Sequence, residues 1–175
     1  QSKLSEPFPV TMFQGKLAQS ESAEAFRTLR GRMALQTGSS ESNCRVSIIT
    51  SALPEEGKST VSTNTAAIFA LTKSKTILID LDLRKPRVHQ YLALDPNHSG
   101  IAEYFDGDAT LEEVTQSVEG IPGLHVISGG AKRFAGGAFA AEEQLPKLLE
   151  KLKGEYDQII LDTAPVLAVS DTLMI

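Results

Sequence analysis

Residues 45 to 80 constrain the fold more than any other stretch of this chain of 175 residues. "RVSIIT" (45–50) and "KTILID" (75–80) are short apolar runs, rich in β-branched residues and bounded by turn residues, a pattern typical of strands buried on both faces. Between them, a loop containing Gly57 leads into "STVSTNTAAIFAL", which predicts a helix. This order predicts two parallel strands joined by a right-handed crossover.

Further strands are predicted at "GLHVIS" (123–128) and "QIILD" (158–162). Before the second lies a predicted helix, "AEEQLPKLLEKLKGEY", with Pro146 expected in its first turn or two and an apolar face formed by Leu145, Leu148, Leu149 and Leu152. Strands that alternate with helices predict an open, mainly parallel α/β sheet flanked by helices, with its ligand at the carboxyl edge.

A helix is also predicted near the N-terminus, with Ser22 as its N-cap and with Phe26, Leu29 and Met33 facing the core. Residues 1–20 lack periodicity and are predicted to be a linker, and 21–175 are predicted to form one domain. The missing initial Met and the uncapped end "SDTLMI" predict an excised piece truncated at its C-terminus. The Gly/Ala-rich residues 128–145 are predicted to form a mobile loop.

The composition excludes several classes of protein. Apolar residues make up 41% and charged residues 22% of the chain, values that argue against disorder or a fibre. The net charge of -5 is spread along the sequence, so no nucleic-acid partner is predicted. The single cysteine, Cys44, favours a reducing compartment, and no apolar run is long enough for a membrane span. The three histidines do not cluster with Cys44 at metal-ligand spacings, so no zinc site is predicted.

"SALPEEGKST" (51–60) matches the phosphate-binding Walker A pattern G-x-x-x-x-G-K-[ST], with Ala52 in place of the first glycine. Such a loop surrounds an anion with backbone N–H groups at a helix N-terminus, while its lysine reaches the outer phosphates and its hydroxyl binds Mg²⁺. Because the cradle is main chain, the carboxylates of Glu55 and Glu56 are expected to point to solvent. The alternative is an ordinary glycine-containing loop before a helix.

Two acidic motifs follow. In "ILIDLDLRKP", Asp80 and Asp82 are expected on one face at the end of a strand, where they can hold Mg²⁺ or accept a proton from a hydroxyl. Arg84 is expected to reach a phosphate or to pair with one of these acids. "IILDTAP" has the form of a Walker B strand whose Asp162 binds Mg²⁺ through water. Alternatively, these acidic residues only cap the turns that follow their strands.

Together, "SALPEEGKST", "ILIDLDLR" and "IILDTAP" resemble the catalytic domain of the bacterial protein-tyrosine kinases, or BY-kinases, that control capsule and exopolysaccharide synthesis. Ile77 to Arg84 fits that family's second Walker motif, A′, completely. The resemblance begins near Ser20 and implies a P-loop NTPase fold of the MinD-like (SIMIBI) class. It also implies transfer of the γ-phosphoryl group of ATP to tyrosine. The family's tyrosine-rich tail is absent here.

The resemblance also implies roles for individual residues. It makes Lys58, Asp80, Asp82 and Arg84 catalytic, with Asp80 as the group that activates the tyrosine hydroxyl. Mg²⁺ is assigned to Ser59, Asp82 and, through water, Asp162. The nucleotide-binding loop comprises Pro54, Glu55, Glu56, Gly57, Lys58, Ser59 and Thr60.

Partners are implied as well. Glu24, Arg27 and Arg30 form an E-x2-R-x2-R stripe, whose spacing alone favours a solvated charged face. In the family this stripe bridges neighbouring subunits of a ring, so the resemblance implies an interface. The resemblance further implies trans-phosphorylation within that ring, an inner-membrane activator segment that is fused or separate, a cognate tyrosine phosphatase, and a place at the cytoplasmic face of the bacterial inner membrane.

Two alternatives stay open at the sequence level. A MinD/ParA-like switch ATPase shares the fold, but its loop carries a second lysine where this chain has Leu53. The other is a nucleotide-sensing scaffold that oligomerises without transferring phosphate, which the intact Lys58, Asp80, Asp82 and Asp162 disfavour.

Overall fold

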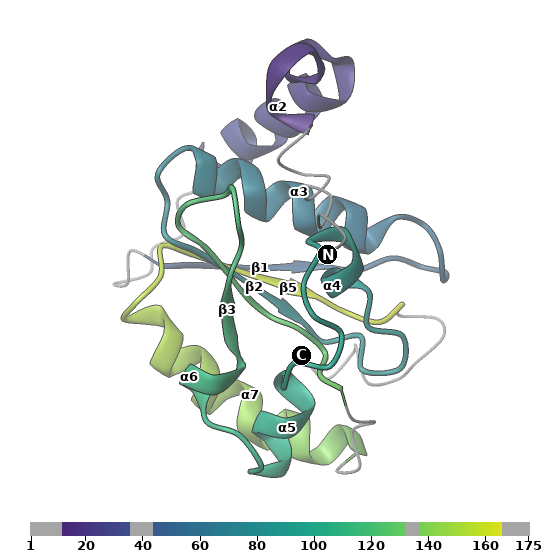
Figure 1. The fold of residues 1–175 in the computed structure, drawn as a ribbon, viewed down its shortest axis with the longest axis vertical. Helices are drawn as coiled ribbons and strands as arrows, with labels where there is room; N and C mark the ends of the chain where they lie inside the picture. Colours follow the sequence, from purple (N-terminus) through teal and green to yellow (C-terminus); the bar gives the residue numbers. More distant parts are fainter. Residues whose placement is uncertain (1–11, 36–43, 132–136, 166–175) are drawn as a thin grey trace, which may run out of the picture.

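A computed structural model describes residues 12–35, 44–131 and 137–165, with the backbone alone for 137–142. Within these residues, five strands form one sheet: β1 (Arg45–Ile49), β2 (Thr76–Asp80), β3 (Thr115–Ser117), β4 (Leu124–Ile127) and β5 (Gln158–Asp162). Their order in the sheet is β1-β5-β2-β4-β3, and only β3 is antiparallel to its neighbour. Figure 1 shows the sheet between its helices.

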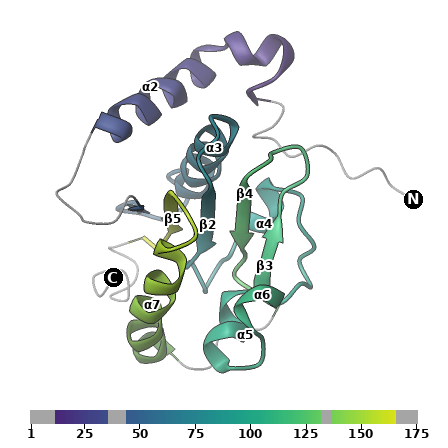
Figure 2. The ribbon, with the colours of Figure 1, turned by 90° about the vertical axis from the view of Figure 1, so that its left-hand side faces the viewer.

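Helices cover both faces of this sheet (Figure 2). One face carries α3 (Lys58–Leu71) and α4 (Val88–Tyr91), and α2 (Glu21–Leu35) packs on the outside of α3, preceded by the 3-10 helix η1 (Gly15–Gln19). The other face carries α5 (Ile101–Asp106), α6 (Leu111–Val114) and α7 (Gly137–Lys153). The predicted fold class, an open and mainly parallel α/β sheet, is confirmed.

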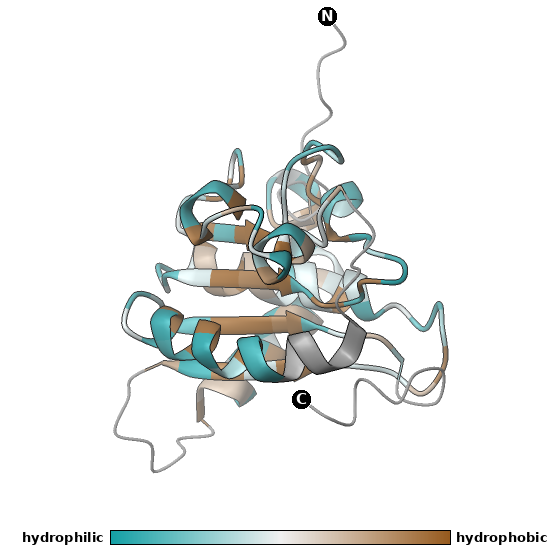
Figure 3. Cartoon of the chain, turned by 90° about the horizontal axis from the view of Figure 1, so that it is seen from below, coloured by the Kyte–Doolittle hydropathy of each residue, from teal (hydrophilic) through white to brown (hydrophobic). Residues whose placement is uncertain are grey.

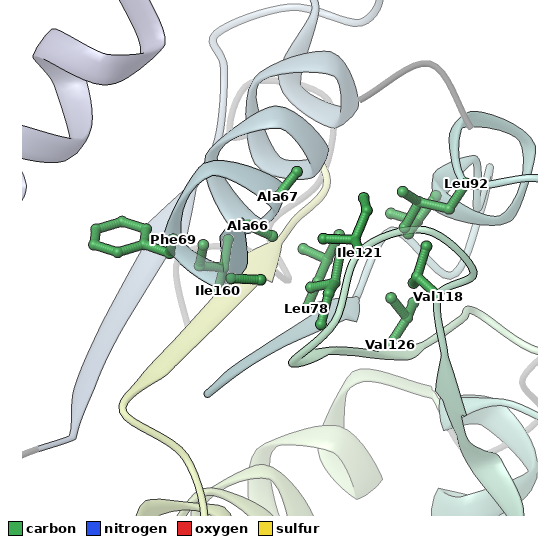
Figure 4. Packing of buried hydrophobic residues seen from close by; sticks show 12 residues of the cluster. Ala66, Ala67, Phe69, Leu78, Leu92, Val118, Ile121, Val126 and Ile160 are labelled. Carbon is green, nitrogen blue, oxygen red and sulfur yellow. The ribbon is translucent and has the colours of Figure 1, made fainter. Parts of the chain in front are cut away.

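Alternation along the central strands divides the core between the two faces. On β2, Leu78 belongs to the same cluster as Ala66 and Ala67 of α3 (Figure 4), whereas Ile77 and Ile79 belong to the cluster under α7. In Figure 3 the strands are mainly brown, the hydrophobic colour, and the exposed helical turns are mainly teal. Among the described residues, no helix is both long enough and apolar enough to span a bilayer.

One strand differs from the prediction. β1 was expected to be buried on both faces, yet Ile48 is 48% exposed and the whole strand is only partly covered. The reason is its place in the sheet: β1 is an edge strand that pairs with β5 alone among the described strands. Sequence periodicity reports apolar content but not whether a neighbouring strand covers the edge.

The N-terminal part also differs. Residues 15–19, predicted to lie in a linker, form η1, and Phe13 packs edge to face against Phe26 at 6.3 Å between ring centroids. The hydroxyl of Ser20, not of Ser22, accepts the Ala23 N–H at the start of α2. Leu29 was expected in the core but is 36% exposed, because α2 packs on another helix and not on the sheet.

The helix before β5 is longer than expected. It was predicted from residue 141, with Pro146 near its start, but α7 already begins at Gly137, so Pro146 lies in mid-helix. The expected loop over 128–145 is therefore helical from 137 onward, and residues 132–136 lie outside the described part. Leu145, Leu148 and Leu152 are buried as predicted. The elements α4, α5, α6 and β3 were not assigned from sequence, because each has six residues or fewer, too few for its pattern to repeat clearly.

Candidate nucleotide-binding site

The loop between β1 and α3 has the backbone of an anion cradle. Gly57 adopts a left-handed conformation (φ +88°) as the N-cap of α3, and Glu55 is also left-handed (φ +67°). Because glycine has no side chain, Gly57 leaves the first N–H groups of the helix without a side-chain cap, which suits an external anion. Lys58, the first helical residue, is buried, with its Nζ 4.0 Å from Oδ2 of Asp82.

Asp162 lies beside this cradle at the carboxyl end of β5. Ser59 Oγ donates a hydrogen bond of 2.7 Å to Asp162 Oδ2, whereas the buried Oδ1 has no hydrogen-bond partner. Burial raises the pKa of Asp162 to about 6, opposed by the Ser59 hydrogen bond and by the charge of Lys58. A buried carboxylate oxygen without a donor suits a water molecule that is bound to a cation.

Asp80 and Asp82 differ sharply in environment. Asp80 is fully buried, and its carboxylate accepts three backbone hydrogen bonds, from Asp82 N–H (3.1 Å), Arg87 N–H (3.0 Å) and Val88 N–H (3.1 Å). Burial, followed by the charge of Asp162, raises the pKa of Asp80 to about 8. The carboxylate thus fastens the loop over residues 81–88, here called the A′ loop.

The two A′ carboxylates were expected to share one face beside the ligand, but their surroundings differ. β2 ends at Asp80, so strand alternation does not extend to Asp82, and the chain turns over the buried carboxylate instead. Only Asp82 reaches the cleft described next.

A cleft of about 530 Å³ opens between the Walker A loop and the A′ loop. Its lining includes most of the predicted nucleotide-binding residues together with four that sequence analysis missed, Lys85, Arg87, Tyr91 and Pro165. The basic run "LRKPR" (83–87) was the sequence signal that could have identified Lys85 and Arg87. The full lining is Pro54, Glu55, Gly57, Lys58, Ser59, Thr60, Asp82, Arg84, Lys85, Arg87, Tyr91 and Pro165.

The two acidic loop residues are exposed, as predicted. Glu56 Oε2 accepts the Leu53 N–H at 2.9 Å, which closes the loop on itself, and Glu56 does not line the cleft. Glu55 lies at the cleft, with its Oε1 3.6 Å from Nη2 of Arg87. Neither carboxylate occupies the anion cradle.

The stripe on α2 lies apart from the cleft. Arg27 pairs with Glu24 at 3.2 Å and donates to the Ala18 carbonyl oxygen at 2.7 Å. Nε of Arg30 is buried without a hydrogen-bond partner. The stripe is therefore partly occupied by contacts within the chain.

These residues fit a magnesium nucleotide. In the described part of the chain, no three acidic, histidine or cysteine side chains come together as a complete metal site. Mg²⁺ does not need one, because it usually takes one or two protein ligands plus phosphate oxygens and water. The Ser59 hydroxyl and Asp82 would provide two such ligands beside the Walker A cradle, and the free Oδ1 of Asp162 could accept a hydrogen bond from a metal-bound water.

Comparison with known proteins agrees with this geometry. A family model described as an AAA domain (AAA_31) matches residues 55–174. The chain belongs to this AAA domain family. The match covers the Walker A lysine, the A′ loop and the Walker B strand.

Two relatives bear on activity. The tyrosine-protein kinase ptk of Acinetobacter johnsonii is 36% identical over 87% of this chain and 20% of its own length. The kinase domain of the Escherichia coli tyrosine kinase ETK matches in structure with a TM-score of 0.85, at 29% identity over 97% of this chain and 64% of that one. The resemblance to bacterial tyrosine kinases is thus confirmed. The chain spans about a fifth of the length of the first curated relatives it matches.

A third relative shares the fold. The septum site-determining protein MinD from Pyrococcus horikoshii, complexed with Mg-ADP, has a TM-score of 0.60 and 26% identity over 68% of this chain and 48% of that one. The predicted MinD-like P-loop class is confirmed by this match.

Proposed function

We propose that this chain is the catalytic domain of an ATP-dependent and Mg²⁺-dependent protein-tyrosine kinase. The observation that carries the proposal is the A′ loop, which closes one wall of the cleft with Asp82 held 4.0 Å from the Walker A lysine Lys58. This places a second acidic motif against the phosphate cradle, and the chain resembles tyrosine kinases over most of its length.

The proposed roles follow from position in the cleft. Lys58 neutralises charge on the β- and γ-phosphates, and Thr60, in the first turn of α3, is assigned to the α-phosphate. Ser59 and Asp82 contact Mg²⁺, and Asp162 holds one of its waters. Arg84 lines the same wall and is assigned to the transferring phosphoryl group. Mg²⁺ supplies charge neutralisation to the phosphates when bound.

For the tyrosine hydroxyl we assign Asp82 in place of Asp80. Asp82 is the A′ carboxylate that lines the cleft, whereas the Asp80 carboxylate accepts three hydrogen bonds from backbone N–H groups of the A′ loop. Because phosphoryl transfer depends mainly on positioning and charge, a loop fixed by Asp80 contributes to catalysis without contact with the reacting atoms.

The wider role is also proposed from the resemblance. In this proposal the kinase acts in trans within a ring that is bridged by Glu24, Arg27 and Arg30, at the cytoplasmic face of the inner membrane. There it works with a polysaccharide co-polymerase or activator segment and a cognate tyrosine phosphatase, and it regulates export of capsule or exopolysaccharide.

A switch ATPase is the second candidate, favoured by the structural likeness to MinD. The position of its second loop lysine is taken by Leu53, whose side chain is 54% exposed. A leucine cannot neutralise phosphate on a partner, so this likeness supports the fold more than the switch mechanism. The third candidate is a scaffold that binds nucleotide as a sensor and does not transfer phosphate.

The test is to incubate the chain with Mg-ATP and a glutamate–tyrosine copolymer, and to measure ADP release and phosphotyrosine together. Phosphotyrosine formation is expected, and Lys58→Met should lower it by about two to three orders of magnitude, the effect typical of removing a group that stabilises transition-state charge. Lys147→Met, on the exposed face of α7, is the matched control. ADP without phosphotyrosine would support the switch ATPase, and nucleotide binding without turnover the scaffold.

A further inference from the structure

We propose that Arg87 is an additional phosphate-binding residue of this site, and that Glu55 holds its guanidinium in place until the outer phosphate of a nucleoside triphosphate displaces the carboxylate. The inference rests on the proposed nucleotide-dependent function and goes beyond its Walker motifs. It also gives a role to the acidic residue that the Walker A loop presents at its cleft.

The backbone of Arg87 is fixed from two sides. Its N–H donates to Oδ2 of the buried Asp80 at 3.0 Å. The preceding residue, Pro86, packs so closely on Gly129 that a Cβ added at Gly129 would lie 2.3 Å from the Pro86 Cβ. The guanidinium is therefore presented to the cleft from a rigid base, and it needs little backbone ordering when a ligand binds.

The ion pair between Arg87 and Glu55 is weak enough for a phosphate to replace the carboxylate. Arg87 Nη2 lies 3.6 Å from Glu55 Oε1, and the two side chains are 45% and 73% exposed. An exposed ion pair of this kind contributes little stability. A phosphate carries more charge and more acceptor oxygens, and it accepts two parallel hydrogen bonds from a guanidinium. Phosphate is thus the stronger partner for Arg87.

The position of Arg87 points to the outer phosphate. Arg87 belongs to the A′ loop, as does Asp82, whose Oδ2 lies 4.0 Å from the Lys58 ammonium. A lysine at this place in a Walker A loop reaches the β- and γ-phosphates. The wall that carries Arg87 therefore faces the end of the phosphate chain, so Arg87 should distinguish a triphosphate from a diphosphate.

The experiment measures the affinity of the chain for fluorescent ADP and for a fluorescent, non-hydrolysable ATP analogue, both with Mg²⁺. Arg87→Ala should weaken binding of the ATP analogue about tenfold, the effect of losing a charge-assisted hydrogen bond, and binding of ADP less than about twofold. The affinity of Arg87→Lys for the ATP analogue should lie between those of the wild type and Arg87→Ala, because lysine keeps the positive charge but cannot donate two parallel hydrogen bonds. Arg32→Ala, an exposed arginine of α2, is the control.

Glu55→Gln supplies the second arm. Removal of the competing carboxylate should tighten binding of the ATP analogue about two- to threefold, and this gain should vanish in the Arg87→Ala background. Glu112→Gln, an exposed acid on α6, controls for the change in net charge. Circular dichroism confirms that each variant is folded.

Three results would overturn the inference: unchanged ATP-analogue affinity in Arg87→Ala, an equal loss for ADP and the ATP analogue, or a Glu55→Gln gain that persists without Arg87. If the wild-type chain binds neither nucleotide, the proposed function fails together with the inference. A wild type that binds both, with an unaffected Arg87→Ala variant, defeats the inference alone.

Discussion

At the scale of single residues, the three carboxylates at the carboxyl edge perform different tasks because their surroundings differ. Asp80 and Asp162 occupy equivalent positions on neighbouring strands, β2 and β5, yet Asp80 binds three backbone N–H groups whereas Asp162 keeps an oxygen without a partner. Asp82 alone lines the cleft. Sequence identified all three but not this division, which depends on where β2 ends.

The first prediction compares how much Asp80 and Asp82 contribute to the stability of the fold. Asp80→Ala should lower the free energy of unfolding by about 2 to 4 kcal/mol, because it leaves three backbone N–H groups without acceptors. Asp82→Ala is the comparison and should cost less, about 1 to 2 kcal/mol, because Asp82 accepts a single backbone N–H, that of Lys85, and pairs with Lys58 at 4.0 Å. Urea unfolding measures both. Equal stability of the two variants would contradict the role of Asp80 as the anchor of the A′ loop.

The second prediction concerns pH at the opposite edge of the sheet. His125 Nδ1 and Tyr156 Oη are 2.6 Å apart, and Lys75 Nζ lies 5.0 Å from the centroid of the Tyr156 ring. Burial, then the charge of Lys75, lowers the pKa of His125 from 6.5, while Glu155 acts in the opposite direction. The folded protein thus binds this proton less readily than the unfolded chain. The stability contribution is fully present above about pH 6.5, the value of the unfolded chain, and is lost as the pH falls from there through the lower pKa of the folded state.

The measurement is urea unfolding at pH 7.5 and pH 5 of the wild type and His125→Phe. Because the imidazole is partly exposed, the effect should be below about 1 kcal/mol, seen as a smaller loss of stability at pH 5 in the variant. His98→Gln leaves the His125–Tyr156 pair intact and should behave as the wild type. An identical loss in His125→Phe would refute the assignment.

At the scale of elements, the sequence predicted what depends on short, regular patterns. β2, β4 and β5 were assigned because each contains a short apolar run, and α3 because it follows the glycine loop between two such runs. The Walker A loop was recognised because its residues are contiguous. The edge position of β1 and the packing of the A′ loop depend on partners distant in sequence. Sequence periodicity does not report such partners.

The third prediction tests the support of the A′ loop by the turn after β4. Gly129→Ala should push Pro86 away, destabilise the protein by about 1 to 3 kcal/mol and weaken nucleotide binding, because the new Cβ has no space. Gly31→Ala is the matched control: Gly31 is helical with nothing within 4 Å of an added Cβ, so alanine should stabilise by about 0.5 to 1 kcal/mol. A Gly129→Ala variant with wild-type stability and affinity would show that the loop does not depend on this contact.

At the scale of the whole molecule, α2 lies outside the two hydrophobic clusters that cover the faces of the sheet. It packs on α3 and η1, and Ala23 is the single fully buried side chain of this helix. Its charged stripe is not fully satisfied within the chain, since Nε of Arg30 is buried without a hydrogen-bond partner. A buried guanidinium nitrogen with no acceptor is costly, and a neighbouring subunit can supply a carboxylate or carbonyl oxygen.

The last prediction follows from that imbalance. Arg27→Ala combined with Arg30→Ala should convert the proposed ring to monomers, measured as mass by light scattering. The combined change should leave the unfolding transition cooperative, because the sheet and both of its hydrophobic clusters lie elsewhere. Arg32→Ala, at an exposed position near the end of the same helix, should keep the wild-type mass. An unchanged mass in the double variant would show that the stripe is a solvated charged face and not an interface. Arg27 would then have Glu24 and the Ala18 carbonyl oxygen as its partners.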